Sequence, residues 1–308
     1  MIEPSLYVLP PIALTDAMFV SSTVPETDYA AYAAGTTYAV GTRCISAVTH
    51  RIYESLRASN TGNDPTAIVN RAGTAPWWLE VGPTNRWAMF DSVVSTQTTV
   101  ASPLTVVLRP GQFNAVYLGG LDADQLALTV RDAPGGAVIY DATLVLEGSA
   151  PADYYEHFFD RFKPQRDYLA SGLDAYYTAE ITLTLTKASG SVKCGILALG
   201  DLKPLGATMY GAKAKPKTYS YIDIDDFGSL TIKRRKATTD VSLSAMLKLD
   251  EANTTLETIQ SVLDVPCAWI GNDLPEYGGL RVFGLGSGEL TYDLPKDCKL
   301  SLTIQGLI

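Results

Sequence analysis

The chain has few of the residues that usually carry metal and acid–base chemistry. It contains two histidines, His50 and His157, and four cysteines that form no C-x-x-C pair. Two histidines cannot build a multi-histidine metal site, and scattered cysteines with apolar neighbours are typical of buried free thiols. We therefore expect no metal and no resident cofactor, in a protein made in a reducing cytoplasm. The cysteines are Cys44, Cys194, Cys267 and Cys298.

Positive charge and long apolar runs are also scarce. The net charge is -9, and the one dense basic run is Lys233–Lys236. A nucleic-acid-binding protein normally has a basic face, so we interpret this run as a solvated strand or an interface patch and expect no nucleic-acid partner. No segment approaches the ~20 apolar residues of a membrane span. Met1–Leu14 lacks the basic region of a secretory signal, so neither a span nor a leader is predicted.

The chain does have enough apolar residues for packed cores, mostly with the periodicity of strands. Hydrophobic residues make up 46% of the 308 residues. The predicted fold class is mainly β, with several domains, because a single domain usually has roughly 100–200 residues. We predict an extended N-terminal arm at 1–24, a small aromatic-rich β module at 25–92, a β-sandwich or jelly-roll-like domain at 93–203, and an α+β domain with one helix at 204–308.

Local patterns place the main elements. Prolines discourage a helix in the arm, which could dock on a neighbouring subunit or on its own chain. Ala179–Thr186 and Val241–Leu249 alternate apolar with other residues, the period of a half-buried strand. Tyr219–Asp225 and Ser229–Arg235 are predicted to form a hairpin. The aromatic and charged segment Tyr154–Tyr168 is expected to be a long loop or a short helix.

One segment of the last domain has helical rather than strand periodicity. Asp250 is a plausible N-cap, and Pro266 cannot continue a helix. The residues expected on the buried helical face are Leu256, Ile259, Val262 and Leu263.

None of the recognisable site patterns has a catalytic spacing. Gly284–Gly288 lacks the lysine of a phosphate-binding loop and the spacing of a dinucleotide turn, so we predict a β-turn there. Asp223 and Asp225 share a strand face, and with Asp226 they could bind a metal together with Asp201 or Asp273. A solvated or subunit-facing strand is the simpler interpretation. His50 with Glu54, or His157 with Glu156, lacks a nucleophile at motif spacing. The sequence therefore predicts no enzyme.

The aromatic side chains of residues 25–92 are the strongest candidates for a binding site. A module this small buries little surface, so large rings are a sensible core, but flat ring faces also stack on sugars. Trp77 and Trp78 are adjacent in an extended segment and point to opposite faces. We expect one of them in the core and the other available to a ligand or a neighbouring domain. The candidate glycan-binding residues are Trp77, Trp78, Tyr38 and Tyr53.

The order of motifs in this module resembles small chitin- and cellulose-binding modules. Tyr38–Cys44 corresponds to their Tyr followed by Gly-x-x-Val, Ile52–Leu56 to their tyrosine strand, Gly62–Pro65 to their proline turn, and Trp77–Gly82 to their Trp-x-x-x-Gly. Cys44 stands where these modules usually have Val. The resemblance implies the fold of such a module, and it does not imply that this copy still binds sugar.

The continuation of the module, Gly82–Asp91, resembles tail and baseplate proteins of tailed phages. Weaker similarity extends to Lys193–Gly200, Leu205–Gly211 and Asp225–Gly228. The resemblance is good over the arm and the aromatic module and moderate over the rest. It implies a structural protein of the virion tail, assembled in the cytoplasm of the bacterial host beside other phage tail proteins.

Three functional hypotheses follow. The first is a structural protein of the tail tip or baseplate that forms a homo-oligomer, a trimer or hexamer, around the tail axis. The second is a receptor-recognition protein that binds a host surface glycan through the aromatic module. The third, a glycan depolymerase, needs a pair of catalytic carboxylates. Any pair could be nominated from 33 acidic residues, so the third has no specific support.

Overall fold

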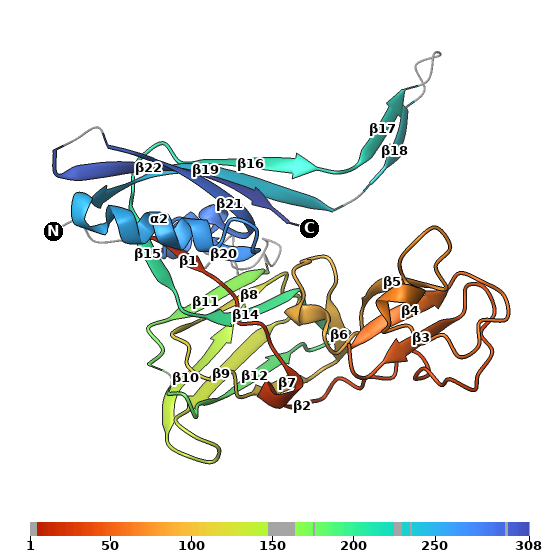
Figure 1. The fold of residues 1–308 in the computed structure, drawn as a ribbon. Helices are drawn as coiled ribbons and strands as arrows, with labels where there is room; N and C mark the ends of the chain where they lie inside the picture. Colours follow the sequence, from red (N-terminus) through yellow and green to blue (C-terminus); the bar gives the residue numbers. More distant parts are fainter. Residues whose placement is uncertain are drawn as a thin grey trace.

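The computed structural model describes residues 5–146, 164–174, 176–224, 230–234, 236–292 and 295–307. The predicted mainly-β class is confirmed. Figure 1 shows three bodies, with a C-terminal barrel above a sandwich and an aromatic module to one side. Within the described ranges, no helix has the length and apolar character needed to cross a membrane.

The N-terminal arm packs on its own chain and joins two of the three bodies. Strand β1 (Leu6–Leu9) lies between β15 (Lys203–Thr208) and β20 (Cys267–Ile270) of the barrel. Strand β2 (Phe19–Ser22) extends the edge of the sandwich by pairing with β7 (Leu104–Leu108). Between them is the short 3-10 helix η1 (Asp16–Met18). The arm thus supplies one strand to the barrel and one to the sandwich, so it docks on its own chain.

The aromatic module is built on one antiparallel sheet in the order β3-β4-β5. Its strands are β3 (Arg43–Ser46), β4 (Arg51–Ser55) and β5 (Trp78–Pro83). The 3-10 helices are η2 (Ile68–Asn70) and η3 (Ala88–Phe90). Because a three-stranded sheet covers few apolar side chains, the interior of the module is a single cluster of three rings and one thiol. That cluster contains Tyr38, Cys44, Tyr53 and Trp78.

The sandwich packs a sheet ordered β10-β9-β12-β7-β2 against one ordered β11-β8-β14. In β12, the alternation predicted from sequence is confirmed, because Ile181, Leu183 and Leu185 are buried between the sheets. A separate pair, β6 with β13, lies beside them. The remaining strands of this body are β6 (Thr98–Ala101), β8 (Ala115–Gly119), β9 (Gln125–Arg131), β10 (Val138–Val145), β11 (Asp167–Ser171), β12 (Glu180–Thr186), β13 (Ser191–Cys194) and β14 (Ile196–Gly200).

The segment expected to interrupt the sandwich is described only in part. Of Tyr154–Tyr168, residues 154–163 lie outside the described ranges, and Asp167 and Tyr168 open strand β11. The prediction of a loop or short helix therefore applies to residues that the structure does not describe.

The C-terminal barrel is a sheet whose strands close on themselves. The order is β15-β1-β20-β21-β22-β19-β16, and β15 also pairs with β19, so six strands form a ring and β16 remains outside it. Buried Val241, Leu243 and Leu247 of β19 alternate with residues that are not buried, as predicted. The remaining strands are β16 (Lys213–Thr218), β19 (Ala237–Lys248), β21 (Arg281–Thr291) and β22 (Asp297–Gly306). The 3-10 helix η5 (Pro275–Leu280) precedes β21.

The predicted helix exists, but its start and its buried face differ from expectation. Helix α2 (Ala252–Ser261) continues from the 3-10 helix η4 (Leu249–Glu251). Its N-cap is Glu251 in helical backbone geometry with no side-chain cap, so the prediction of Asp250 as N-cap is wrong. Ile259 and Val262 are buried as predicted, whereas Leu256 is only half-buried and Leu263, beyond the end of the helix, is exposed. Thr255 is buried on this face, which the pattern did not predict.

The glycine-rich run Gly284–Gly288 lies inside β21, so the predicted β-turn is wrong. Glycine within a strand often marks a close approach of other atoms. A Cβ at Gly284 would lie 2.1 Å from the carbonyl oxygen of Gln305. A Cβ at Gly286 would lie 2.2 Å from Cζ2 of Trp269, the fully buried indole of this body. These glycines let the neighbouring strand and the indole pack against the β21 backbone.

A two-stranded ribbon projects from the barrel (Figure 1). Strands β16 and β19 continue into β17 (Tyr221–Ile224) and β18 (Leu230–Lys233), which confirms the predicted hairpin pairing. Its connecting turn, with Asp225–Gly228, lies outside the described ranges. Every residue of β18 is exposed. We use the name ribbon for residues 213–236.

The four cysteines are buried free thiols, as predicted. Burial raises the pKa of the Cys44 thiol to about 11 and that of Cys194 and Cys267 to about 12. A thiol becomes nucleophilic only as the thiolate, so these three side chains are packing groups.

Candidate functional site

Three of the four candidate glycan-binding residues form the core of the aromatic module. Trp78 is 1% exposed, Tyr53 1% and Tyr38 5%. A ring that is covered on both faces cannot stack on a sugar, so the prediction that these three contact a glycan is corrected: they hold the module together. Their hydrophobic area is needed inside because the module has so little other apolar surface to bury.

Trp78 is held by both ring packing and a hydrogen bond. Its Nε1 donates to the carbonyl oxygen of Asn63 at 2.7 Å. Its ring centroid lies 5.0 Å from that of Tyr38 and 6.0 Å from that of Tyr32, in edge-to-face arrangements. The proline turn predicted from Gly62–Pro65 therefore supplies the acceptor that fixes the indole.

Trp77 packs against this cluster as well, but it is only half-buried. The guanidinium carbon of Arg57 lies 4.9 Å from its ring centroid, within the range of a cation–π contact. The backbone carbonyl of Trp77 accepts the amide of Leu56 at 2.9 Å, so the chain is fixed although the indole is partly free. Of the four candidates, Trp77 alone is not in the buried class.

The polar cluster around His50 was not found by sequence reasoning. Nδ1 of His50 lies 2.8 Å from Oε1 of Glu26, and Nε2 lies 2.7 Å from Oδ1 of Asp16. The imidazole stacks on Trp87 with ring centroids 4.1 Å apart. Each ring nitrogen thus lies within hydrogen-bond distance of a different carboxylate. We call His50, Glu26, Asp16 and Trp87 the His50 clasp.

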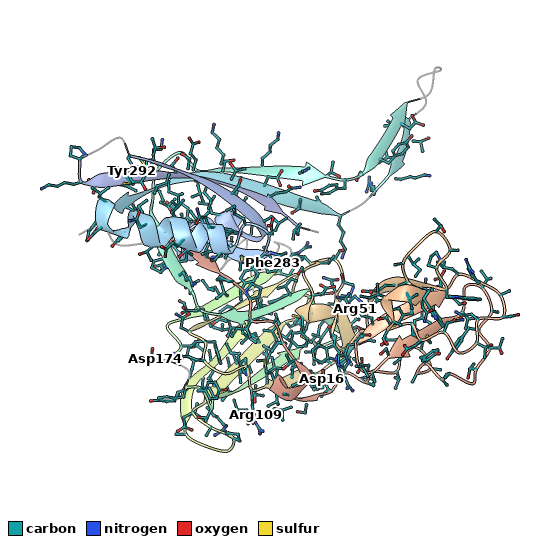
Figure 2. All side chains as sticks on the ribbon, in the orientation of Figure 1. Asp16, Arg51, Arg109, Asp174, Phe283 and Tyr292 are labelled. Carbon is teal, nitrogen blue, oxygen red and sulfur yellow. The ribbon has the colours of Figure 1, made fainter. Side chains whose placement is uncertain are left out.

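The His50 clasp fastens the aromatic module to the arm and to the linker before the sandwich. Glu26 also accepts from the Thr84 hydroxyl at 2.8 Å, and Arg86 lies 3.7 Å from its other oxygen. His50 has a positive φ of 53°, which non-glycine residues adopt rarely. Figure 2 labels Asp16 and Arg51 in this region, between the sandwich and the module. No local pattern could reveal the clasp, because its members come from three separate segments.

A cleft of about 520 Å³ opens beside the clasp, lined by residues that include Asp16, His50, Arg51 and Asp91. Burial raises the pKa of the Asp91 carboxyl. Glu54, which the sequence offered as a partner of His50, pairs with Arg43 at 2.8 Å instead. The other suggested pair, His157 with Glu156, lies outside the described ranges. The cleft holds polar groups, but no arrangement of nucleophile, base and third group is among those lining it.

The acidic residues that the sequence offered as metal ligands are not brought together by the part of the chain that the structure describes. There, no group of three or more His, Cys, Asp or Glu side chains could hold a metal ion. Asp223 is exposed on β17, and Asp225 lies outside the described ranges.

We expect His50→Asn to lower the free energy of unfolding by about 1–3 kcal/mol, because Glu26, only 10% exposed, would lose its hydrogen bond with the imidazole. Asn tolerates positive φ, so the loss reports on the clasp rather than on backbone strain. Urea unfolding with hydrogen exchange over residues 25–92 measures it. The matched control, Asp16→Asn, removes a carboxylate that is 68% exposed and should cost less than ~1 kcal/mol. Equal costs for both variants would contradict the assignment of Glu26 as the central partner.

Comparison of the chain with protein-family models, with curated proteins and with solved structures found no match.

Proposed function

We propose that this chain is a structural protein of a phage tail tip or baseplate, which forms a homo-oligomer around the tail axis and contacts other tail proteins in the virion. The proposal assigns it no catalytic step. The observation that carries it is the outer part of the ribbon of residues 213–236, where β17 and β18 project from the barrel and, among the described residues, pair with no strand but each other. The resemblance of Gly82–Asp91 to tail and baseplate proteins supports the same conclusion.

The ribbon cannot gain much stability from its own chain. An isolated two-stranded hairpin is at best marginally stable in water, because it has no second layer to cover. The β18 residues are all exposed, and so are Tyr219 and Tyr221 on the adjoining strand. β16 is an edge strand of the barrel sheet, and an edge strand presents unpaired backbone groups to a partner. Binding to another subunit would cover the exposed side chains of the ribbon and would pair the free backbone groups of β16.

The charge of the ribbon differs in sign from the charge of the rest of the chain. Residues 213–236 contain seven Lys or Arg and three Asp, a net charge of +4, so the remainder carries −13 of the total of −9. On β16, Lys213 and Lys215 are exposed. Opposite potentials on two parts of one chain favour association between copies. This complementarity supports a homo-oligomer in which the ribbon meets an acidic surface of a neighbour.

The test compares the mass of the purified chain with that of two charge-reversal variants. One variant carries Lys213→Glu, Lys215→Glu and Lys233→Glu in the ribbon, and the matched control carries Lys248→Glu, Lys296→Glu and Lys299→Glu in the barrel. Light scattering after size-exclusion chromatography should show a trimer or hexamer for the wild type and the control, and a monomer for the ribbon variant. Association should also weaken as salt is raised.

Two results would overturn the proposal. One is a wild-type chain that stays monomeric at every accessible concentration and is absent from purified virions. The other is a ribbon variant that assembles as the wild type does. A cryo-EM map of the particle would then show where the chain lies and how many copies surround the axis.

The second candidate is a receptor role for the same tail component, with a host surface glycan as ligand. The observation in its favour is Trp77, the candidate ring that remains partly free beside Arg57. Glycan-array binding that is lost in Trp77→Ala, with hydrogen exchange of the module unchanged, would support it. If the wild-type chain binds no glycan on the array, the receptor role is excluded.

A further inference from the structure

A cationic cleft lies between the sandwich and the barrel. Its volume is about 710 Å³. Arg166 and Lys193 line it from the sandwich, and Lys236 and Arg281 line it from the barrel. The acidic residues in its lining are Asp122 and Asp167, so the lining has two positive charges in excess. This excess is notable in a chain whose net charge is -9.

Both carboxylates of the cleft already have cationic partners. Asp122 bonds Lys187, which does not line the cleft, and lies 4.0 Å from Lys193. Asp167 lies 3.8 Å from Nη1 of Arg281. Among the described residues, Arg166 has no carboxylate partner, and Lys236 donates only to the backbone carbonyl of Ser95 at 3.1 Å. Within the part of the chain that the structure describes, two cations, one from each body, therefore have no carboxylate partner.

Arg281 is a buried cation with unused hydrogen-bonding capacity. Its side chain is 9% exposed, and Nη2 donates to the carbonyl oxygen of Asp273 at 2.5 Å. Its Nε has no hydrogen-bond partner, and neither has Oδ2 of Asp167. Burial raises the pKa of Asp167, while Arg281 acts to lower it. Because Arg281 is poorly screened by solvent, its attraction for an anion is stronger than that of an exposed cation.

We propose that this cleft binds a phosphate group, either free or on a small phosphorylated molecule. A compact anion with two charges matches the excess of two cations. The planar guanidinium groups of the arginines can donate paired hydrogen bonds to the oxygens of a phosphate, and the ammonium groups of the lysines act as point charges. The volume leaves room for a small organic group beside the phosphate. This inference does not depend on the proposed role in the tail.

Binding would also join the two bodies. Arg166 immediately precedes β11 of the sandwich, and Lys236 lies at the base of the ribbon, next to β19 of the barrel. An anion held by both reduces their repulsion and resists separation of the sandwich from the barrel. A ligand that binds only the folded form raises its stability, so phosphate should raise the unfolding temperature of the intact chain.

The experiment measures phosphate binding by the full chain. Isothermal titration calorimetry with inorganic phosphate and with glycerol 3-phosphate is compared with glycerol and with sodium chloride at equal ionic strength. We expect saturable binding of the phosphates, and about a tenfold or greater loss of affinity in Arg166→Ala with Lys236→Ala. Both side chains are exposed, so the double variant should fold, which circular dichroism checks. The matched control is Lys248→Ala with Lys299→Ala, which leaves the cleft intact.

Each outcome distinguishes a specific site from general charge screening. Tighter binding of glycerol 3-phosphate than of phosphate indicates a phosphorylated small molecule, and the reverse order indicates the free ion. No saturable heat in the wild type would overturn the inference. So would equal affinity in the cleft variant and the control variant, because the binding would then come from scattered surface lysines.

Discussion

Trp78→Ala is expected to lower the free energy of unfolding of the aromatic module by about 3–5 kcal/mol, the usual cost of removing a large buried aromatic side chain. The indole is one of three rings in the cluster that forms the interior of the module. Its removal would also leave the Asn63 carbonyl without its donor and take away the edge contacts to Tyr38 and Tyr32. A module with so small a core has little stability to spare, so residues 25–92 should open while the sandwich and barrel stay folded.

The neighbouring tryptophan provides the matched control. Trp77→Ala removes the same number of atoms from a half-buried position, and we expect a cost of about 1 kcal/mol or less. Trp78→Phe keeps a ring but loses the Nε1 donor, so its cost should lie between the two. Hydrogen exchange followed by mass spectrometry locates the opening. Equal exchange in Trp77→Ala and Trp78→Ala would contradict the difference in burial between the two indoles.

Gly286→Val is expected to destabilise the barrel by more than about 3 kcal/mol, beyond the usual range for an overpacked core. Even the Cβ would lie 2.2 Å from Cζ2 of Trp269 and 2.6 Å from Cε2. The indole cannot move aside easily, since it is fully buried and its Nε1 donates to the Gly284 carbonyl at 3.0 Å. The strand or the indole must shift, and either change disrupts packing across the ring of strands.

The chain offers a control at Gly278, where a Cβ would meet no atom within 4 Å and φ is not positive. Gly278→Ala should change the free energy of unfolding by less than about 0.5 kcal/mol. A double-mutant cycle adds a sharper test: Trp269→Leu frees space at the contact, so Gly286→Ala should cost at least ~1 kcal/mol less in that background. Thermal and urea unfolding measure these values. Additive costs would contradict the contact between Gly286 and Trp269.

Part of this fold follows from periodicity alone. Alternation along Ala179–Thr186 and Val241–Leu249 identified β12 and β19, because side chains of a strand point alternately to two faces. The apolar neighbours of the cysteines indicated buried thiols, and the change of period after residue 250 indicated a helix. In each case, the residues that determine the outcome lie within a few positions of one another.

The glycine-rich run shows where local reasoning fails. Gly284–Gly288 has the composition of a turn, and glycine is favoured in turns because it tolerates positive φ. Here the reason for glycine is the indole of Trp269 and the backbone of β22, which are distant in sequence and fill the space of a Cβ. A single residue type serves two physical purposes, and only the neighbours distinguish them.

By itself, the sequence determined the mainly-β class, the alternating strands and the helical segment. The tertiary structure decided which of the indoles of Trp77 and Trp78 is buried, where the arm pairs, and which charged groups meet in the His50 clasp and the cationic cleft. Leu6 lies opposite Gly206 and Tyr7 opposite Ile270, pairings across most of the chain. The residues of a strand determine which of its faces is apolar. Its partner strands depend on the burial and hydrogen bonding of the complete fold, to which segments distant in sequence contribute.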